Sequence, residues 1–409
     1  MTTSPIAIEN TPVSAAELKT EILALVRQYS ATVPAEGRTD AAGLAALIES
    51  LLDAELGGAR SAERFEDKLA ELFGVREALL VNSGASANLV AVSSLTSPRM
   101  GKLRLKAGDE VITLASGSPS LTAAIVQNQL VPVFVDLSLP GFNVDVRQLQ
   151  GALSSRARAI LLPHVCGNPF DLDAVTMFAA FNNLLLIEDC RDAAGATFGG
   201  RSVGCFGQFA TASFRDGRQL ATGEGGAVLA STPLYRSIAE SFRDGGRGDS
   251  AGGARTHAGY NLRATEMQAA LGSAQMAGLA ARLDERSENA MTLIDGLAGL
   301  AEHFIFPESL RAARPSWLEL PIAIRETARF TRDGLLALLA AGGIAARPFS
   351  PELPSHPAFE SRTHRTAGAL PVSRLVAANG LLVKIPPSAA QSDVATIVET
   401  FHSAVNDLR

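Results

Sequence analysis

Seven short apolar runs, each followed by a more polar or amphipathic segment, constrain this chain more than any other feature. They are EALLVN, DEVITL, LVPVFVDL, ARAILLPH, LLLIED, FATASF and GAVLAS, all between residues 77 and 231. Alternation of strand-like and helix-like segments is typical of βαβ units, which place parallel strands in one sheet. The sequence therefore predicts an α/β fold with one large, mostly parallel seven-stranded sheet, and a ligand at the carboxyl ends of its strands.

Helical patterns and a smaller strand-rich part flank these runs. Two helical stretches, at about 16–29 and 40–56, come first, and the amphipathic segment SAERFEDKLAELFG follows them. After the sheet, residues 264–297 are expected to form one long helix, and the strands SWLELPIAI and LLVKIP lie beyond it. We expect an N-terminal helical segment (1–60), a large domain (61–298) and a small C-terminal α+β domain (299–409).

Composition excludes several classes of protein. The net charge of −6 gives no general basic field, so neither nucleic acid nor an anionic membrane is an expected partner. The three cysteines, Cys166, Cys190 and Cys205, are odd in number and lack CxxC spacing, which predicts no metal site and fits a reducing compartment. No apolar run approaches the roughly 18 residues of a membrane span, and we expect a cytoplasmic protein.

Two segments place functional groups where strands end. In VNSGASANLVAV, Gly84 lies at a strand-to-helix turn, where free amide groups and the helix dipole favour a phosphate; an ordinary turn is the alternative. LLLIEDC ends in Glu188 and Asp189. A carboxylate there suits a protonated pyridine nitrogen, because an ion pair raises the pKa of the ring; alternatively, Asp189 caps the next turn.

Three further segments carry a family resemblance. SFRDGRQLATGEGGAVL, taken with GYNLRATEMQAALG and HVCGNPFDLD, resembles the DegT/StrS nucleotide-sugar aminotransferases, which are pyridoxal phosphate (PLP) enzymes of fold type I. NSGASANL, LTSPRMGKLRLKAGDEVIT, NPFDLDAV and SFRDGGR are most similar to the branch of 3-dehydrases acting on CDP-4-keto-6-deoxyglucose. The resemblance implies a PLP-dependent transferase fold, a nucleotide-sugar ligand, and a homodimer that shares its active sites.

The same resemblance implies roles for individual residues. The backbone amides of Gly84 and Ala85 and the hydroxyl of Ser213 would bind the cofactor phosphate. Asp189 would hold the pyridine nitrogen. Asn261 would reach the phosphate of the other subunit, which makes the dimer part of each site.

The position of the family's cofactor-binding lysine holds Arg218 instead. A guanidinium stays protonated up to a pKa of about 12.5 or higher, so it neither bonds covalently to PLP nor readily removes a proton. The 3-dehydrase branch carries a histidine here. All five lysines lie outside residues 107–383, so we expect none of them to take its place. Arg218 marks either loss of function or reuse of the site for a phosphate or carboxylate.

Other departures surround the same pocket. Arg191 and the cysteine-free loop GRGDSAGGARTHAG replace the cluster ligands of some 3-dehydrases, so no iron-sulfur cluster is expected. Ser118 replaces the aromatic residue that stacks on the pyridine ring, and Asp192 stands near the ring hydroxyl. His164 ends a strand at the ligand edge, where it is either a catalytic group or a hydrogen-bonded core histidine.

Two functions follow as hypotheses. In the first, the protein binds PMP (pyridoxamine phosphate) or PLP non-covalently and acts like a 3-dehydrase on a nucleotide-linked 4-keto-6-deoxysugar, with His164 or a water molecule as the base. In the second, it is a catalytically silent homologue that binds a nucleotide sugar, or an active paralogue, as a regulator or scaffold.

Overall fold

The structure is a computed structural model that describes residues 19–25, 45, 47–49, 61–247, 255, 257–386 and 391–408. Residues 19–25 and 47–49 are helical, and Lys19 and Glu49 form an ion pair of 3.2 Å between them. The rest of the two helices expected at 16–29 and 40–56 lies outside the described residues. In the described part of the chain, no helix combines the length and apolar composition needed to cross a membrane.

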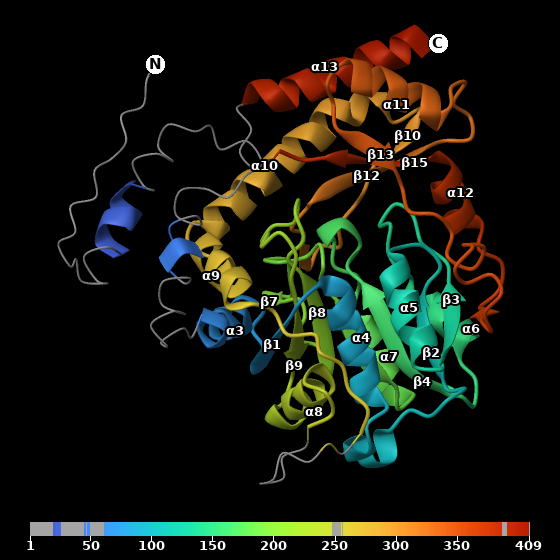
Figure 1. Cartoon of the computed structure of the whole chain (residues 1–409). Helices are drawn as coiled ribbons and strands as arrows, with labels where there is room; N and C mark the ends of the chain where they lie inside the picture. The colour runs from blue at the N-terminus through green and yellow to red at the C-terminus, as the bar shows by residue number, and fades with distance from the viewer. Residues whose placement is uncertain are drawn as a thin grey trace.

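All seven predicted strands form, and they lie in one sheet (Figure 1). An eighth strand, only two residues long, joins the sheet from the C-terminal part of the chain and pairs parallel to β3. β9 runs antiparallel to both of its neighbours, and the other strand pairs are parallel. The order is β1 (Glu77–Val81), β9 (Gly226–Ala230), β8 (Phe209–Ser213), β5 (Leu185–Asp189), β4 (Ala157–Pro163), β2 (Glu110–Leu114), β3 (Val131–Val135) and β14 (Arg365–Thr366).

Helices cover both faces of this sheet because its strands are apolar on both sides. On one face, the side chains of Val111, Leu161 and Val228 pack in a cluster with α4, α5 and α8. On the other face, Ile112 and Leu162 pack in a second cluster with α3, α6, α7 and α9. The helices are α3 (Ser61–Leu72), α4 (Gly84–Leu95), α5 (Pro119–Gln127), α6 (Val146–Ala152), α7 (Leu172–Phe181), α8 (Pro233–Arg243) and α9 (Glu266–Gln275), with short helices at Pro98–Leu103 and Val165–Gly167.

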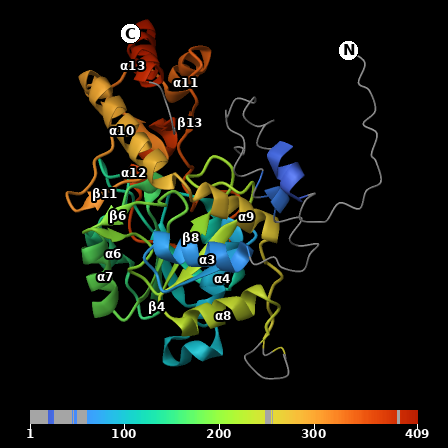
Figure 2. The same cartoon turned by 90° about the vertical axis from the view of Figure 1, so that its left-hand side faces the viewer.

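The C-terminal part contains a second, antiparallel sheet covered by helices. The strand order is β10 (Phe304–Ile305), β12 (Glu319–Ile324), β15 (Gly380–Lys384) and β13 (Ala346–Pro348). A small sheet of β11 (Ala313–Arg314), β6 (Thr197–Phe198) and β7 (Arg201–Ser202) and the short helix Ala298–Leu300 join it to the large part. The helices α10 (Leu279–Leu297), α11 (Arg332–Ala341), α12 (Pro371–Asn379) and α13 (Gln391–Leu408) complete it, and Figure 2 shows α10, α11 and α13 together beyond the large sheet.

The two parts are closely connected. Their apolar residues form one continuous cluster, which runs from the large sheet through Leu297 and Phe304 to Phe401 of α13. β14 also carries the C-terminal part back into the large sheet. The expected boundary at residues 298 and 299 coincides with the end of α10, and the three-part division stays a prediction.

The prediction of one long helix over residues 264–297 was wrong. The chain forms α9 and α10, separated at Gly278, whose backbone is left-handed with a φ of 73°. Glycine adopts this conformation without steric conflict, whereas it would strain other residues. The guanidinium of Arg282 donates hydrogen bonds to the carbonyls of Gln275 and Ala277, so the free carbonyls at the break are bound.

Candidate active site

A cavity of about 540 Å³ lies at the carboxyl ends of the parallel strands, the edge at which the sequence predicts a ligand. The segments that follow β2, β4, β5 and β8 form one wall. The other wall comes from α10 and from β12, β13 and β15 of the small sheet. The cavity therefore lies between the two parts of the molecule.

The predicted phosphate contacts meet at the start of α4. Ser83 caps this helix, accepting a hydrogen bond of 3.1 Å from the amide of Ser86. A Cβ atom at Gly84 would stand only 2.5 Å from the Cβ of Ser213, so only glycine lets the helix start approach the end of β8 this closely. Gly84, Ala85 and Ser213 are therefore neighbours, and Ala85 is exposed. They lie outside the cavity wall itself.

Asp189 is a buried carboxylate at the end of β5, with 1% of its surface exposed. Its Oδ2 accepts a hydrogen bond of 2.7 Å from Nε of Arg191, and its Oδ1 accepts one of 3.0 Å from the Arg191 amide. Asp189 therefore caps the turn that follows it, as the alternative interpretation holds. The Arg191 guanidinium also donates to Ser120 at the start of α5. The carboxylate assigned to the pyridine nitrogen is thus paired with a cation of its own chain.

Arg218 lines the cavity and forms an ion pair with Asp192. The loop that carries it is closed by hydrogen bonds from the amides of Asp216 and Thr222 to the carbonyls of Gly223 and Phe214. Burial lowers the pKa of Arg218, and the nearby charge of Arg191 lowers it further. Arg218 and Asp192, both predicted from the sequence, therefore meet inside the cavity.

Ser118 also lines the cavity, where it caps the start of α5. Its hydroxyl accepts a hydrogen bond from the Ser120 amide at 3.4 Å. Asn261 lies elsewhere, exposed, in a backbone bridge with Asp244 and away from the cavity of its own chain. Its predicted reach into the site of a second subunit stays a prediction.

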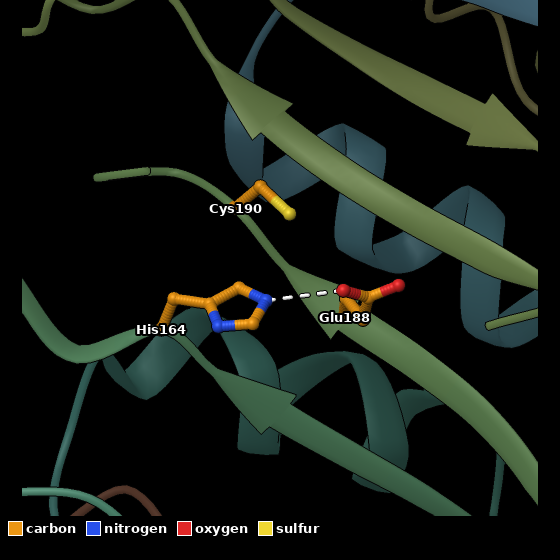
Figure 3. A group of neighbouring side chains, drawn as sticks. All are labelled: His164, Glu188 and Cys190. Atoms are coloured by element: carbon orange, nitrogen blue, oxygen red, sulfur yellow. Dashed lines mark hydrogen bonds and ion pairs between the residues drawn. The ribbon is translucent and has the colours of Figure 1, made fainter. Parts of the chain in front are cut away.

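His164 lies outside the cavity wall. Its Nε2 lies 3.1 Å from an oxygen of Glu188 (Figure 3). Its ring stacks on Phe170 with centroids 4.4 Å apart. The side chain is fully buried and does not contribute to the cavity wall. Of the two interpretations of His164, the geometry favours the hydrogen-bonded core histidine over the catalytic group.

His164, Glu188 and Cys190 form a buried group whose ligand atoms lie within 4.8 Å of one another. The Glu188 carboxylate accepts hydrogen bonds from three backbone amides of the loop before β8, at Gly204, Phe206 and Gly207. Burial raises the pKa of the Cys190 thiol well above its ordinary value, so the thiol stays protonated. A metal ion would have to displace these amides, and we interpret the group as a structural anchor for the loop.

Sequence reasoning missed four cations of the cavity wall, Arg215, Arg286, Arg347 and Lys384. Arg347 of β13 is paired with Glu319 of β12, across β15, which lies between these two strands. β15 brings Lys384 to the wall from the C-terminal part of the chain, although its number lies outside residues 107–383. That no lysine takes the place of Arg218 stays a prediction. A lysine at the end of the apolar run LLVKIP was the available signal.

Curated relatives share much of the sequence of this chain. The chain is 38% identical over 381 residues to the dTDP-4-dehydro-2,6-dideoxy-D-glucose 3-dehydratase of Saccharopolyspora spinosa, covering 87% of this chain and 82% of that protein. It is 36% identical to the lipopolysaccharide biosynthesis protein RfbH of Salmonella typhimurium, covering 87% and 91%.

Solved structures share the fold. The Escherichia coli GDP-4-keto-6-deoxy-D-mannose-3-dehydratase with bound hydrated PLP superposes with a TM-score of 0.81 at 24% identity, covering 88% of this chain and 97% of that one. 3-Amino-5-hydroxybenzoic acid synthase superposes with a TM-score of 0.83, covering 91% and 98%. The family model of the DegT/DnrJ/EryC1/StrS aminotransferases matches residues 40–402, and the chain belongs to this family.

Proposed function

We propose that this protein holds PMP or PLP without a covalent bond and acts on a nucleotide-linked 4-keto-6-deoxysugar in a reaction of the 3-dehydratase kind. The observation that carries this proposal is the contact of Gly84 with Ser213, next to the strand that ends in the buried Asp189. The 38% identity to a sugar 3-dehydratase supports the reaction class.

The residues present fit the cofactor at two points. The first amides of α4, at Gly84 and Ala85, and the Ser213 hydroxyl suit its phosphate, because a helix start attracts an anion. Asp189 suits the pyridine nitrogen, which would replace the Arg191 guanidinium as its partner. When bound, the cofactor supplies an electron sink, which makes it easier to break a bond next to the sugar carbon that is joined to the cofactor.

The chain's own residues would orient the sugar and move its protons. Arg218, held by Asp192, presents a fixed cation that can bind an oxygen of the sugar. Asp216 lines the cavity two residues earlier, is exposed, and forms no ion pair in the described chain. We assign Asp216 the role of proton acceptor in place of His164, whose ring is held by Glu188.

The test is to incubate the purified protein with PMP and a CDP- or GDP-4-keto-6-deoxyhexose. We expect a change in cofactor absorbance, and we expect mass spectrometry to detect loss of the C3 hydroxyl. The Asp216→Asn variant should bind PMP normally and turn over about 10² to 10⁴ times more slowly. If the wild type shows no spectral change and no deoxygenation, the proposed activity is ruled out.

The ion pairs inside the site favour a second candidate, a catalytically silent homologue that regulates or supports an active paralogue. The Arg191–Asp189 and Arg218–Asp192 pairs satisfy both carboxylates without any cofactor. Co-expression with an active family member should then give mixed dimers with altered turnover. Turnover by the isolated protein would exclude this candidate.

A further inference from the structure

Arg286 of α10 is a buried cation on the cavity wall for which the described part of the chain supplies no ion-pair partner. It is 9% exposed, and its Nε is enclosed with no hydrogen-bond partner. Within the described residues, no carboxylate lies at ion-pair distance from its guanidinium. A charge buried without a partner lowers stability, so its presence in a cavity wall indicates an anionic ligand.

Three other cations of the wall are already neutralised. Arg191, Arg218 and Arg347 are bound to Asp189, Asp192 and Glu319, respectively. Asp216, the remaining acid of the wall, is exposed, and among the described residues it pairs with no cation. The positive charge of Arg286 is therefore left for a ligand.

The surroundings of Arg286 add positive charge. Burial lowers the pKa of Arg286 to about 10, and the charge of Arg282, one turn earlier on α10, contributes. At neutral pH the guanidinium is still protonated. A bound anion would relieve both the desolvation and the repulsion.

A second cation lies at the same place. Asn289, three residues after Arg286, donates a hydrogen bond of 3.2 Å to the carbonyl of Pro386. This bond holds the turn of α10 that carries Arg286 against the chain just beyond β15, and β15 ends at Lys384. The Lys384 side chain is exposed, lines the cavity, and is not ion-paired in the part of the chain that the structure describes.

We propose that Arg286 and Lys384 together bind the diphosphate of a nucleotide ligand in this cavity. The inference rests on the proposed nucleotide-sugar ligand and adds the residues that would recognise it. Two unpaired cations, one a rigid fork of donors and one a mobile ammonium, suit phosphate oxygens. The phosphate of the cofactor has its own site at Gly84 and Ser213, away from this wall.

The experiment measures the binding of CDP, GDP, UDP and dTDP by calorimetry with no cofactor present. Arg286→Gln and Lys384→Gln should each weaken the nucleotide that binds to wild type by about tenfold or more, because each removes a charge-assisted hydrogen bond. Arg314→Gln, which removes a charge paired with Asp284 outside this cavity, should leave the affinity unchanged.

Stability without ligand separates a binding role from a structural one. Since Arg286 is an unpaired buried charge, Arg286→Gln should unfold at the same temperature as wild type or higher, and a nucleoside diphosphate should raise its melting temperature less. Equal nucleotide affinity in wild type and both variants would overturn the proposal. So would a failure of wild type to bind any of the four diphosphates.

Two further measurements, binding of inorganic phosphate and turnover of the sugar by the variants, separate this proposal from its alternatives and from the proposed function. Inorganic phosphate that binds as tightly as the nucleotides would overturn the nucleotide assignment. If neither substitution affects deoxygenation of the sugar, the proposed function stands and the diphosphate subsite is ruled out. Nucleotide binding that depends on Arg286, without turnover, would keep the subsite and remove the enzyme activity.

Discussion

At the scale of single residues, the site is defined by internal ion pairs. Arg191 binds Asp189 and Arg218 binds Asp192, so two arginines stand where the family resemblance places cofactor contacts or their neighbours. In each pair, the arginine supplies the counter-charge of a carboxylate that has little contact with water. Binding of the pyridine nitrogen at Asp189, as proposed, must therefore compete with an existing contact, and we expect no covalent attachment at Arg218.

Replacing Arg218 with lysine should allow that attachment. If Arg218 marks the lysine position, added PLP will bond to the new amine and give a yellow protein with an adduct that borohydride traps and mass spectrometry locates. The wild type should show no adduct at this position. Arg215→Lys, which places a lysine on the same loop, is the matched control and should not be labelled. A folded Arg218→Lys variant that stays colourless with saturating PLP would contradict the alignment or the pocket.

Removing Arg191 should strengthen PLP binding. Arg191→Ala frees Asp189 for the pyridine nitrogen. Because PLP then no longer displaces a charge-assisted hydrogen bond, its affinity should rise about tenfold. Without ligand, the variant should melt at a lower temperature, because Asp189 is then a buried carboxylate without its ion pair. A fluorescence titration with PLP measures the affinity, and Arg314→Ala controls for the lost charge. Unchanged or weaker PLP binding in Arg191→Ala would argue against the competition.

At the scale of elements, the break between α9 and α10 positions the site. It separates α9, which packs on α3, from α10, which carries Arg286 into the cavity wall and packs on α13. A straight helix over residues 264–297 would direct α10 differently. The left-handed conformation of Gly278 is therefore part of how the cavity forms.

Gly278→Ala should destabilise the protein through its backbone. The new Cβ would lie 3.4 Å from Arg282 Nη1, so the expected loss of about 1 kcal/mol comes from the φ of 73°, which strains a residue other than glycine. Urea unfolding measures the change. Gly299→Ala is the control, since its φ is not in the left-handed region and its nearest neighbour is His402 at 3.8 Å. Equal midpoints for the two variants would show that the break tolerates a side chain.

At the scale of the whole molecule, the cavity is distinct from the predicted phosphate cradle, which consists of Gly84, Ala85 and Ser213. The cavity is enclosed between the two parts of one chain, whereas Ala85 at the cradle is exposed. Asn261, also exposed, lies away from its own cavity. An exposed predicted cradle, and a predicted contact residue outside its own cavity, suit the expected dimer with shared sites.

We therefore expect a homodimer in sedimentation at micromolar concentration. Ser213→Asp and Asn261→Asp should each weaken PLP binding, because a new carboxylate repels the phosphate. Co-refolding the two variants should restore roughly a quarter of the sites, since half of the random dimers contain one intact site. A monodisperse monomer would contradict the assembly, and a dimer without restoration would show that Asn261 does not act across the interface.

The sequence by itself determined the strands, the family and the order of the site segments. Apolar runs such as LLLIED and GAVLAS record burial on both faces of a sheet, and parallel connections bring their carboxyl ends to one edge. Tertiary structure alone decided where His164 points, that Arg191 binds Asp189, and that Arg286 and Lys384 share a wall. Side-chain direction after a strand and contacts between distant segments depend on packing across the whole chain, which local patterns do not record.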